Sequence, residues 1–335
     1  MKWLNPRIWV GLLISAWCIF VLARDVRFDE VGPTLLKTNL LFVALAIGTI
    51  PFFMWLKALR WRLFFPDPES ARNAGLVPAL YIGYMVNTIA PLRMGELVRA
   101  YLVGHHDRLG VSTVLATIVL EKLFDVGSLA VMLLVLVLTT PLPDWAMAGG
   151  VASAVFLAAG VVGTVLAIAA ERPMLALTAA VEKRVPLLER LQPTALLSSF
   201  IGGLRSVKQP VTLMWVIVWS AVLWVGGALT LYLGMASIGL SGSWPLFFFV
   251  IVVTNLGMSV PSAPGYVGVY HYLVVLSMGV FGVDSASATS LAIVLHTGVF
   301  GTFLVGGLLY LWRGHFALSQ IMAGAQRSAE EAHAH

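Results

Sequence analysis

The chain has 335 residues, of which 59% are hydrophobic and only 11% are charged. A soluble globular protein carries about 25% charged residues, so this chain lacks the polar side chains needed to cover a water-facing surface. The composition predicts an all-α polytopic membrane protein and excludes soluble enzymes, secreted domains and nucleic-acid-binding proteins. The formal net charge of +5 is then expected in the loops that flank the membrane.

Hydrophobic runs place the membrane crossings. A helix needs about 20 apolar residues to cross a hydrocarbon core of roughly 30 Å. Six segments meet or approach this length and are predicted to be transmembrane helices: residues 8–23, 38–56, 112–138, 145–170, 211–235 and 288–312. We expect one transmembrane domain over residues 1–315, followed by a polar tail over residues 316–335.

Two further hydrophobic stretches, residues 76–104 and 244–281, are interrupted by proline and glycine. Proline cannot donate a backbone hydrogen bond and glycine permits a sharp reversal, so neither stretch is expected to form one straight helix. We predict two re-entrant helical hairpins, whose broken backbone lipid tolerates only when it is buried in protein or lines a wet cavity. The predicted hinge residues are Pro91, Gly95, Pro261, Pro264, Gly265 and Gly268.

The two interruptions share a pattern. Ala90-Pro91-x-x-x-Gly95 in the first half returns as Ala263-Pro264-x-x-x-Gly268 in the second. Three predicted spans separate the hairpins, so the two hairpins enter from opposite sides. This arrangement predicts an inverted-topology repeat over residues 8–138 and 145–312, which is typical of transporters.

Lysine and arginine residues are distributed unevenly between the predicted loops. With the N-terminus inside, 15 of the 21 fall in inside segments, among them Lys57 and Arg60 just after the second predicted span. Only three fall outside, as the positive-inside rule requires. We therefore expect a multi-pass protein of the inner (cytoplasmic) membrane with both termini in the cytoplasm.

Three segments together carry a family resemblance. They are residues 84–102, with Asn87, Pro91, Arg93, Gly95, Glu96 and Arg99; residues 117–127, with Glu121, Lys122 and Asp125; and the Pro-Gly-rich residues 261–269. The combination resembles the lysylphosphatidylglycerol synthase transmembrane region, or flippase-like domain family. The resemblance implies a protein that moves or handles lipid-linked substrates, in some members fused to a soluble aminoacyl-transferase domain. Little sequence follows the last predicted span, so we expect a stand-alone form without that domain.

Ionisable side chains within membrane segments are costly and are candidates for function. We predict that Arg93 and Arg99, with Asn87, bind a lipid phosphate, because the planar guanidinium suits that anion. The helix starting near Met94 would also point its N-terminal amides at the phosphate. Glu96, Glu121, Lys122 and Asp125 are predicted to be coupling groups or charge partners. The alternative is an ion-pair cluster that only stabilises the fold, and both interpretations hold if headgroups exchange with the carboxylates.

Polar residues of the second half are predicted to line the same cavity: Asn255, Tyr270 and His271. His271 is either a buried structural residue or a proton relay. Asn87 and Asn255 either cap the backbone at the breaks or bind substrate.

The sequence contains no Walker A loop, nucleophile elbow or zinc-binding spacing, so we expect no nucleotide, cofactor or metal. We predict a transporter rather than an enzyme: a flippase for an anionic phospholipid or a polyprenyl-phosphate-linked lipid. One alternative is a membrane-embedded transferase with a lipid-phosphate donor and Glu96, Glu121 or Asp125 as general base. The other is a non-transporting scaffold that binds envelope biosynthesis enzymes.

Overall fold

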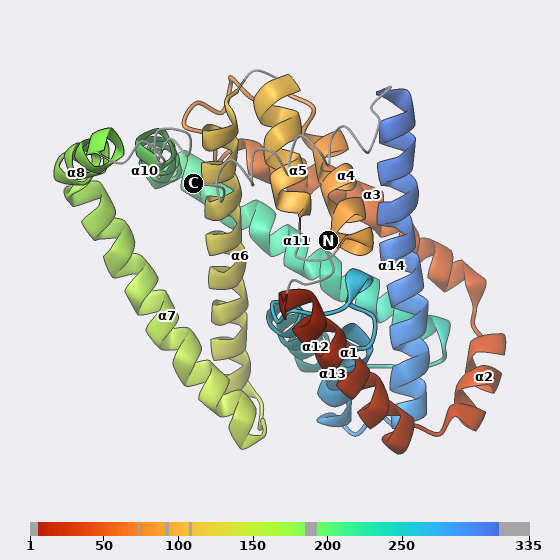
Figure 1. The fold of residues 1–335 in the computed structure, drawn as a ribbon. Coiled ribbons are helices and arrows are strands. Elements are labelled where there is room, and N and C mark those ends of the chain that lie inside the picture. The colour runs from red at the N-terminus through yellow and green to blue at the C-terminus, as the bar shows by residue number, and fades with distance from the viewer. Residues whose placement is uncertain (1–5, 73, 91–93, 107–108, 185–192, 315–335) are drawn as a thin grey trace.

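A computed structural model describes residues 6–72, 74–90, 94–106, 109–184 and 193–314 (Figure 1). These residues form thirteen α-helices and no strand. The helices are α1 (Pro6–Asp25), α2 (Phe28–Leu36), α3 (Leu40–Arg62), α4 (Leu76–Ile89), α5 (Gly95–Tyr101), α6 (Val111–Thr139), α7 (Asp144–Ala169), α8 (Glu171–Arg184), α10 (Pro193–Lys208), α11 (Pro210–Ser237), α12 (Trp244–Gly257), α13 (Val269–Gly279) and α14 (Ser285–Arg313). The predicted all-helical class is confirmed.

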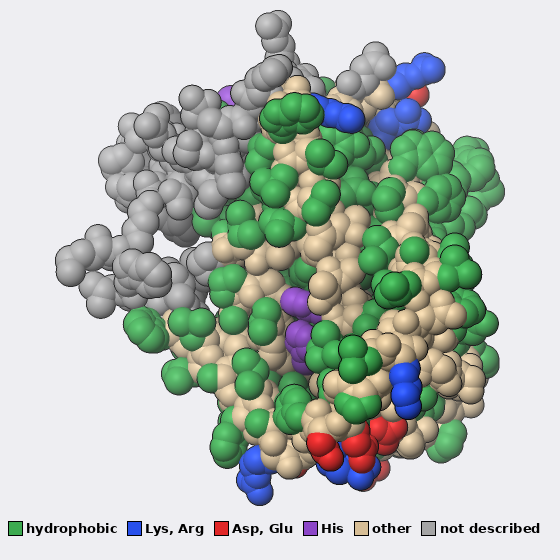
Figure 2. Space-filling model, turned by 90° about the vertical axis from the view of Figure 1, so that its right-hand side faces the viewer, with side chains coloured by type: hydrophobic (Ala, Val, Ile, Leu, Met, Phe, Trp, Pro, Cys, Tyr) green, Lys and Arg blue, Asp and Glu red, His purple; other side chains and the backbone are tan. Residues whose placement is uncertain are grey.

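Four of these helices, α3, α6, α11 and α14, are long and apolar enough to cross a membrane. Helices α1 and α2 pass the same test together, although the chain bends by 90° between them, which gives up to five candidate spans. The remaining predicted span, residues 145–170, corresponds to helix α7. In Figure 2, hydrophobic side chains cover the middle of the displayed face, while charged side chains gather at its top and bottom.

Both predicted interruptions separate two helices. The first lies between α4 and α5, where the two helices approach closely: a Cβ on Gly95 would lie 2.0 Å from the Gly83 carbonyl oxygen. Only a residue without a side chain fits there. A π-helical turn, Leu102–His106, directly follows α5.

The second interruption lies between α12 and α13 and contains a 3₁₀ turn, Pro264–Tyr266. Gly265 and Gly268 have φ angles of 67° and 86° in this region, and Tyr266, at 58°, is the described non-glycine residue with positive φ. A Cβ on Gly268 would also lie 2.7 Å from the Ser15 carbonyl oxygen of α1. The backbone reversal and the close approach of α1 therefore both depend on this glycine.

Helix α3 differs from the prediction. The sequence indicated that the span ends at residue 56, with Lys57 and Arg60 in a water-facing segment. The helix instead continues to Arg62, and Arg60 is only 1% exposed. The apolar residues Ala58, Trp61, Phe64 and Phe65, all buried in the largest hydrophobic cluster, hold this continuation inside the protein.

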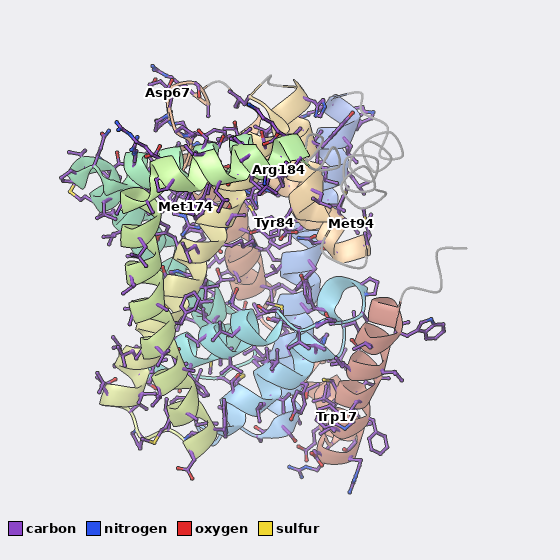
Figure 3. All side chains as sticks on the ribbon, turned by 60° about the vertical axis from the view of Figure 1, so that its left-hand side comes forward. Trp17, Asp67, Tyr84, Met94, Met174 and Arg184 are labelled. Atoms are coloured by element: carbon purple, nitrogen blue, oxygen red, sulfur yellow. The ribbon has the colours of Figure 1, made fainter. Side chains whose placement is uncertain are left out.

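The polar stretch after α7 forms two helices. Figure 3 shows α8, which carries Met174 and Arg184, running across the end of α7. Helix α10 packs on α6 and buries Ile201, Leu204 and Val207. In the structure α10 is part of the helical bundle, because its apolar residues recur on one face.

Candidate phosphate-binding cavity

A cavity of about 460 Å³ lies between the two broken segments. Residues of α4 and α5 line it from the first segment, and residues of α12, the 3₁₀ turn and α13 line it from the second. Helices α3, α6, α11 and α14 complete the walls. The polar lining residues are Lys57, Arg60, Tyr84, Asn87, Thr88, Glu96, Lys122, Asp125, Thr230, Thr254, Asn255, Ser259, Tyr266 and Tyr270.

Carboxylates of α6 hold a cluster of cations at one end of this cavity. Lys57 Nζ lies 2.9 Å from Glu121 Oε1 and 3.4 Å from Asp125 Oδ2. Arg60 Nη2 lies 2.5 Å from Asp125 Oδ1, and its Nη1 donates a hydrogen bond to Ser220 Oγ at 3.0 Å. Glu121 and Asp125 lie on one face of α6 because they are four residues apart.

Arg99 completes the buried part of the cluster. Its Nη2 lies 2.5 Å from Glu121 Oε2, and its guanidinium carbon lies 4.0 Å from the centre of the Trp61 ring. The Trp61 indole nitrogen donates a hydrogen bond to Thr117 Oγ1 at 2.9 Å, which fixes the ring. Arg99 and Glu121 do not line the cavity. They connect α5 to α6 behind its wall.

Lys122 and Glu96 form the looser, more exposed pair of the cluster. Lys122 Nζ lies 3.5 Å from Glu96 Oε1, and the two side chains are 42% and 22% exposed. Both residues line the cavity. Because this pair is long and partly solvated, it is the pair that a bound anion separates at least cost.

The described part of the cluster contains an excess of positive charge. Lys57, Arg60, Arg99 and Lys122 face the three carboxylates of Glu96, Glu121 and Asp125. Two buried donors on cavity-lining residues, Arg60 Nε and Trp224 Nε1, also have no hydrogen-bond partner among the described residues. An unpaired buried donor costs about 1–3 kcal/mol. An anion in the cavity would compensate the excess positive charge.

Asn87 caps the first break. Its Oδ1 accepts a hydrogen bond from the Gly95 backbone nitrogen at 2.8 Å, and its Nδ2 donates to Glu96 Oε2 at 3.3 Å. The first amide of α5 is therefore already occupied by Asn87. That amide is not free for a phosphate, while the other N-terminal amides of α5 stay a predicted part of the site. Pro91 and Arg93 lie outside the described residues.

Two of the three polar residues predicted from the second half line the cavity. Asn255 and Tyr270 line the cavity, but Asn255 Nδ2 already donates to the Ile251 carbonyl oxygen at 2.9 Å. His271 does not line the cavity; its ring centre lies 4.8 Å from that of His296. His296 Nε2 donates a hydrogen bond to the Gly265 carbonyl oxygen at 2.7 Å and so holds the second break.

Lys57, Arg60 and Tyr84 line the cavity, although the sequence patterns did not single them out as candidate site residues. Tyr84 stacks on Phe303 of α14, with ring centres 4.8 Å apart, and both rings line the cavity. The apolar residues that follow Lys57 were the available signal, because they indicate that α3 remains buried beyond the predicted end of the span.

Comparisons with known proteins agree with the family that the motifs suggested. The chain is 25% identical to "Glycosyltransferase AglD" of Haloferax volcanii over 89% of this chain and 53% of that protein. It thus spans about half the length of that curated relative. It is 26% identical to a "UPF0104 membrane protein" of Methanothermobacter thermautotrophicus over 84% of this chain and 87% of that protein.

Residues 8–307 match the family described as "Lysylphosphatidylglycerol synthase TM region". The matched range contains all the residues that line the cavity. This multi-pass membrane protein belongs to the lysylphosphatidylglycerol synthase TM region family.

Proposed function

We propose that the protein is a flippase that moves an anionic phospholipid or a polyprenyl-phosphate-linked lipid between leaflets. The observation that carries this proposal is the cavity between the two broken segments, whose charged end has more cations than carboxylates. The rest of its wall combines uncharged polar side chains with apolar and aromatic ones, such as Phe300 and Phe303. Such a cavity suits a phosphate headgroup, while the hydrocarbon tail stays in lipid.

The membrane arrangement in this proposal is the one expected from the sequence. Residues 1–315 form one transmembrane domain with six crossing helices and two re-entrant hairpins, and residues 316–335 form a tail. Residues 8–138 and 145–312 are inverted repeats whose relative rocking exposes the cavity to each side in turn. Both termini lie in the cytoplasm, and the membrane is the inner membrane.

In this proposal the cluster divides into an exchangeable part and a fixed part. The phosphate binds Lys57, Arg60 and Lys122, and Arg93 remains a proposed ligand. Lys122 releases Glu96 as the phosphate arrives, because that pair is long and partly exposed. Arg99 acts through Glu121, which positions Lys57, and Asn87 positions Glu96.

A transferase is the second candidate, and one observation favours it. The relative from Haloferax volcanii is named a glycosyltransferase, and this chain is similar to about half of it. Glu96 is then the general base, because it lines the cavity and is partly exposed. Glu121 and Asp125 are poorer candidates, because close cations already pair with their carboxylates. In a third case the chain is a scaffold for envelope biosynthesis enzymes and transports nothing.

The test is lipid exchange in proteoliposomes, with labelled phosphatidylglycerol and a labelled polyprenyl phosphate as separate probes. We expect wild-type protein to move one of them, and Lys122→Gln or Glu96→Gln to lower the rate about tenfold or more. Glu171→Gln is the matched control. Glu171 pairs with the exposed Arg205, and neither residue lines the cavity. Size-exclusion chromatography checks that each variant folds.

Two results would contradict the proposal: absence of lipid exchange, and lipid exchange that does not depend on the cavity residues. Absence of exchange for both probes with folded protein would favour the transferase or the scaffold. Group transfer from the polyprenyl probe that depends on Glu96 would distinguish the transferase from the scaffold. Equal exchange rates in the wild type and the cavity variants would place the transport route elsewhere.

A further inference from the structure

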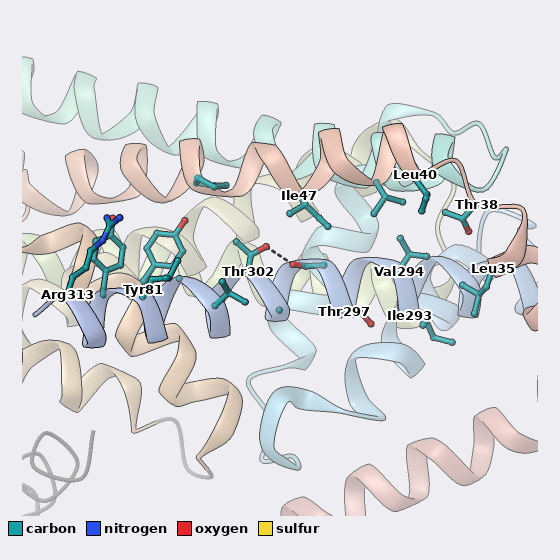
Figure 4. Close-up of a pocket in the computed structure, with 18 residues that line it drawn as sticks. Leu35, Thr38, Leu40, Ile47, Tyr81, Ile293, Val294, Thr297, Thr302 and Arg313 are labelled. Atoms are coloured by element: carbon teal, nitrogen blue, oxygen red, sulfur yellow. Dashed lines mark hydrogen bonds between the residues drawn. The ribbon is translucent and has the colours of Figure 1, made fainter. Parts of the chain in front are cut away.

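A second and larger hollow, of about 840 Å³, runs between α3 and α14 (Figure 4). It shares no lining residue with the charged cavity. The two hollows lie on different faces of the same helices: Ile47 and Thr302 line the groove, whereas Ile50 and Phe303 line the cavity. The groove is therefore a separate candidate site.

The groove is as long as the membrane is thick. Its lining residues on α14 run from Ile293 to Arg313, which is about 30 Å at 1.5 Å per residue. The hydrocarbon core of a bilayer is also about 30 Å thick. Each chain of a diacyl phospholipid reaches only about half of that depth, since the two leaflets share it. A single hydrocarbon chain that fills the groove must be longer.

The floor of the groove is apolar and open. Gly298, Gly301 and Gly306 line it, and a Cβ on Gly301 would meet no atom within 4 Å. The Thr302 hydroxyl donates to the Gly298 carbonyl oxygen of its own helix at 2.7 Å, as Figure 4 shows. This internal bond uses the hydroxyl donor of Thr302.

One end of the groove carries a cation. Arg313 lines it in the last turn of α14, is exposed, and has no ion-pair partner among the described residues. The rings of Tyr81 and Tyr310 lie beside it, with centres 5.5 Å apart. A guanidinium next to aromatic side chains at the end of a transmembrane helix suits an interfacial phosphate.

We propose that this groove binds a polyprenyl phosphate, with its single chain along α14 and its phosphate at Arg313. A single long chain matches the length of the groove, and a single phosphate matches the cation at its end. The inference does not rest on the proposed function, because the groove and the charged cavity have no residue in common.

The experiment measures binding of a photoactivatable long-chain polyprenyl monophosphate to the whole chain in phosphatidylcholine nanodiscs. Gly301→Leu fills the open floor, and its control is Gly163→Leu on α7, where a Cβ also meets nothing within 4 Å. Arg313→Gln removes the cation, and its control is Arg24→Gln at the end of α1. Thr297→Leu, at an exposed lining position, is a second filling variant should Gly301→Leu fail to fold.

We expect the filling variant and Arg313→Gln each to weaken binding about tenfold, and the controls to stay within about twofold of wild type. The cross-linked residues are then identified: labelling of groove residues reports this site, and labelling of residues of the charged cavity reports the other. Failure of the flippase proposal and failure of this one are therefore distinguishable. Wild-type affinity in both the filling variant and Arg313→Gln would overturn the proposal. Equal competition by phosphatidylglycerol would also overturn it, because a diacyl lipid would then occupy the groove.

Discussion

Arg99 on α5 and Glu121 on α6 form a buried ion pair with 2.5 Å between Nη2 and Oε2. Their side chains are 4% and 0% exposed. Because Trp61 of α3 covers the guanidinium, this pair joins three helices behind the cavity wall. It fixes the first broken segment to the long helix that carries Asp125 and Lys122.

Glu121→Gln should be among the most destabilising single substitutions in the chain. Glutamine leaves Arg99 and Lys57 without their shared carboxylate, and an uncompensated buried charge costs about 3–5 kcal/mol. Thermal unfolding in detergent measures the loss. Glu171→Gln at the exposed pair with Arg205 should cost at most about 1 kcal/mol. Equal losses in the two variants would show that burial of the pair does not govern its contribution.

Gly95→Ala should prevent the first broken segment from closing. The added Cβ would lie 2.0 Å from the Gly83 carbonyl oxygen, and backbone atoms cannot move aside as a flexible side chain can. We expect misfolded or aggregated protein on size-exclusion chromatography. In contrast, Gly48→Ala on α3 adds a Cβ that meets no atom within 4 Å, so it should be neutral or slightly stabilising. A monodisperse Gly95→Ala protein would contradict the close approach of α4 and α5.

His296→Ala should loosen the second break. The Gly265 carbonyl oxygen loses its 2.7 Å hydrogen bond, and an unsatisfied buried carbonyl costs about 1–3 kcal/mol. Hydrogen exchange of the backbone amides in residues 263–268 measures the local opening, and we expect faster exchange than in wild type. His105→Ala, at an exposed histidine stacked on Tyr101, is the control and should leave this exchange unchanged.

The stability of the protein is expected to depend on pH through Asp284, which lies at the N-terminal end of α14. Its carboxylate caps α14 by accepting a hydrogen bond from the Ser287 amide at 2.9 Å, which lowers the pKa of the carboxyl below its ordinary value of 3.8. The cap therefore stabilises the protein above that value and weakens as the pH falls through the lower pKa of the folded state. Asp284→Ala should cost about 1 kcal/mol at pH 7. This cost should shrink at acidic pH.

Asp284→Asn is the control for that measurement, because asparagine keeps the capping oxygen at every pH. Thermal unfolding of the three proteins between pH 7 and strongly acidic pH separates the effects. A constant difference between wild type and Asp284→Ala over the whole range would argue against capping by the ionised carboxylate.

Local sequence patterns were sufficient for much of the fold. Runs of apolar residues located the long helices. In lipid, the backbone N–H and C=O groups of such a run must form hydrogen bonds within the segment, and a helix provides them. Proline and glycine located both breaks, because these residues act on the backbone next to them. The charged residues of α5 and α6 were recognised because they lie inside otherwise apolar segments.

The composition and these local patterns by themselves determined that the protein is helical, lies in a membrane, belongs to its family and is interrupted at two places. Only the tertiary structure decided that Lys57 and Arg60 join the cluster, that Arg99 lies behind the wall and that His296 holds the second break. These relationships link residues on different helices, as in the pairs Arg60–Asp125 and His296–Gly265. The physical reason is that helical periodicity fixes which face of a helix a residue occupies, whereas the packing of whole helices fixes what that face meets.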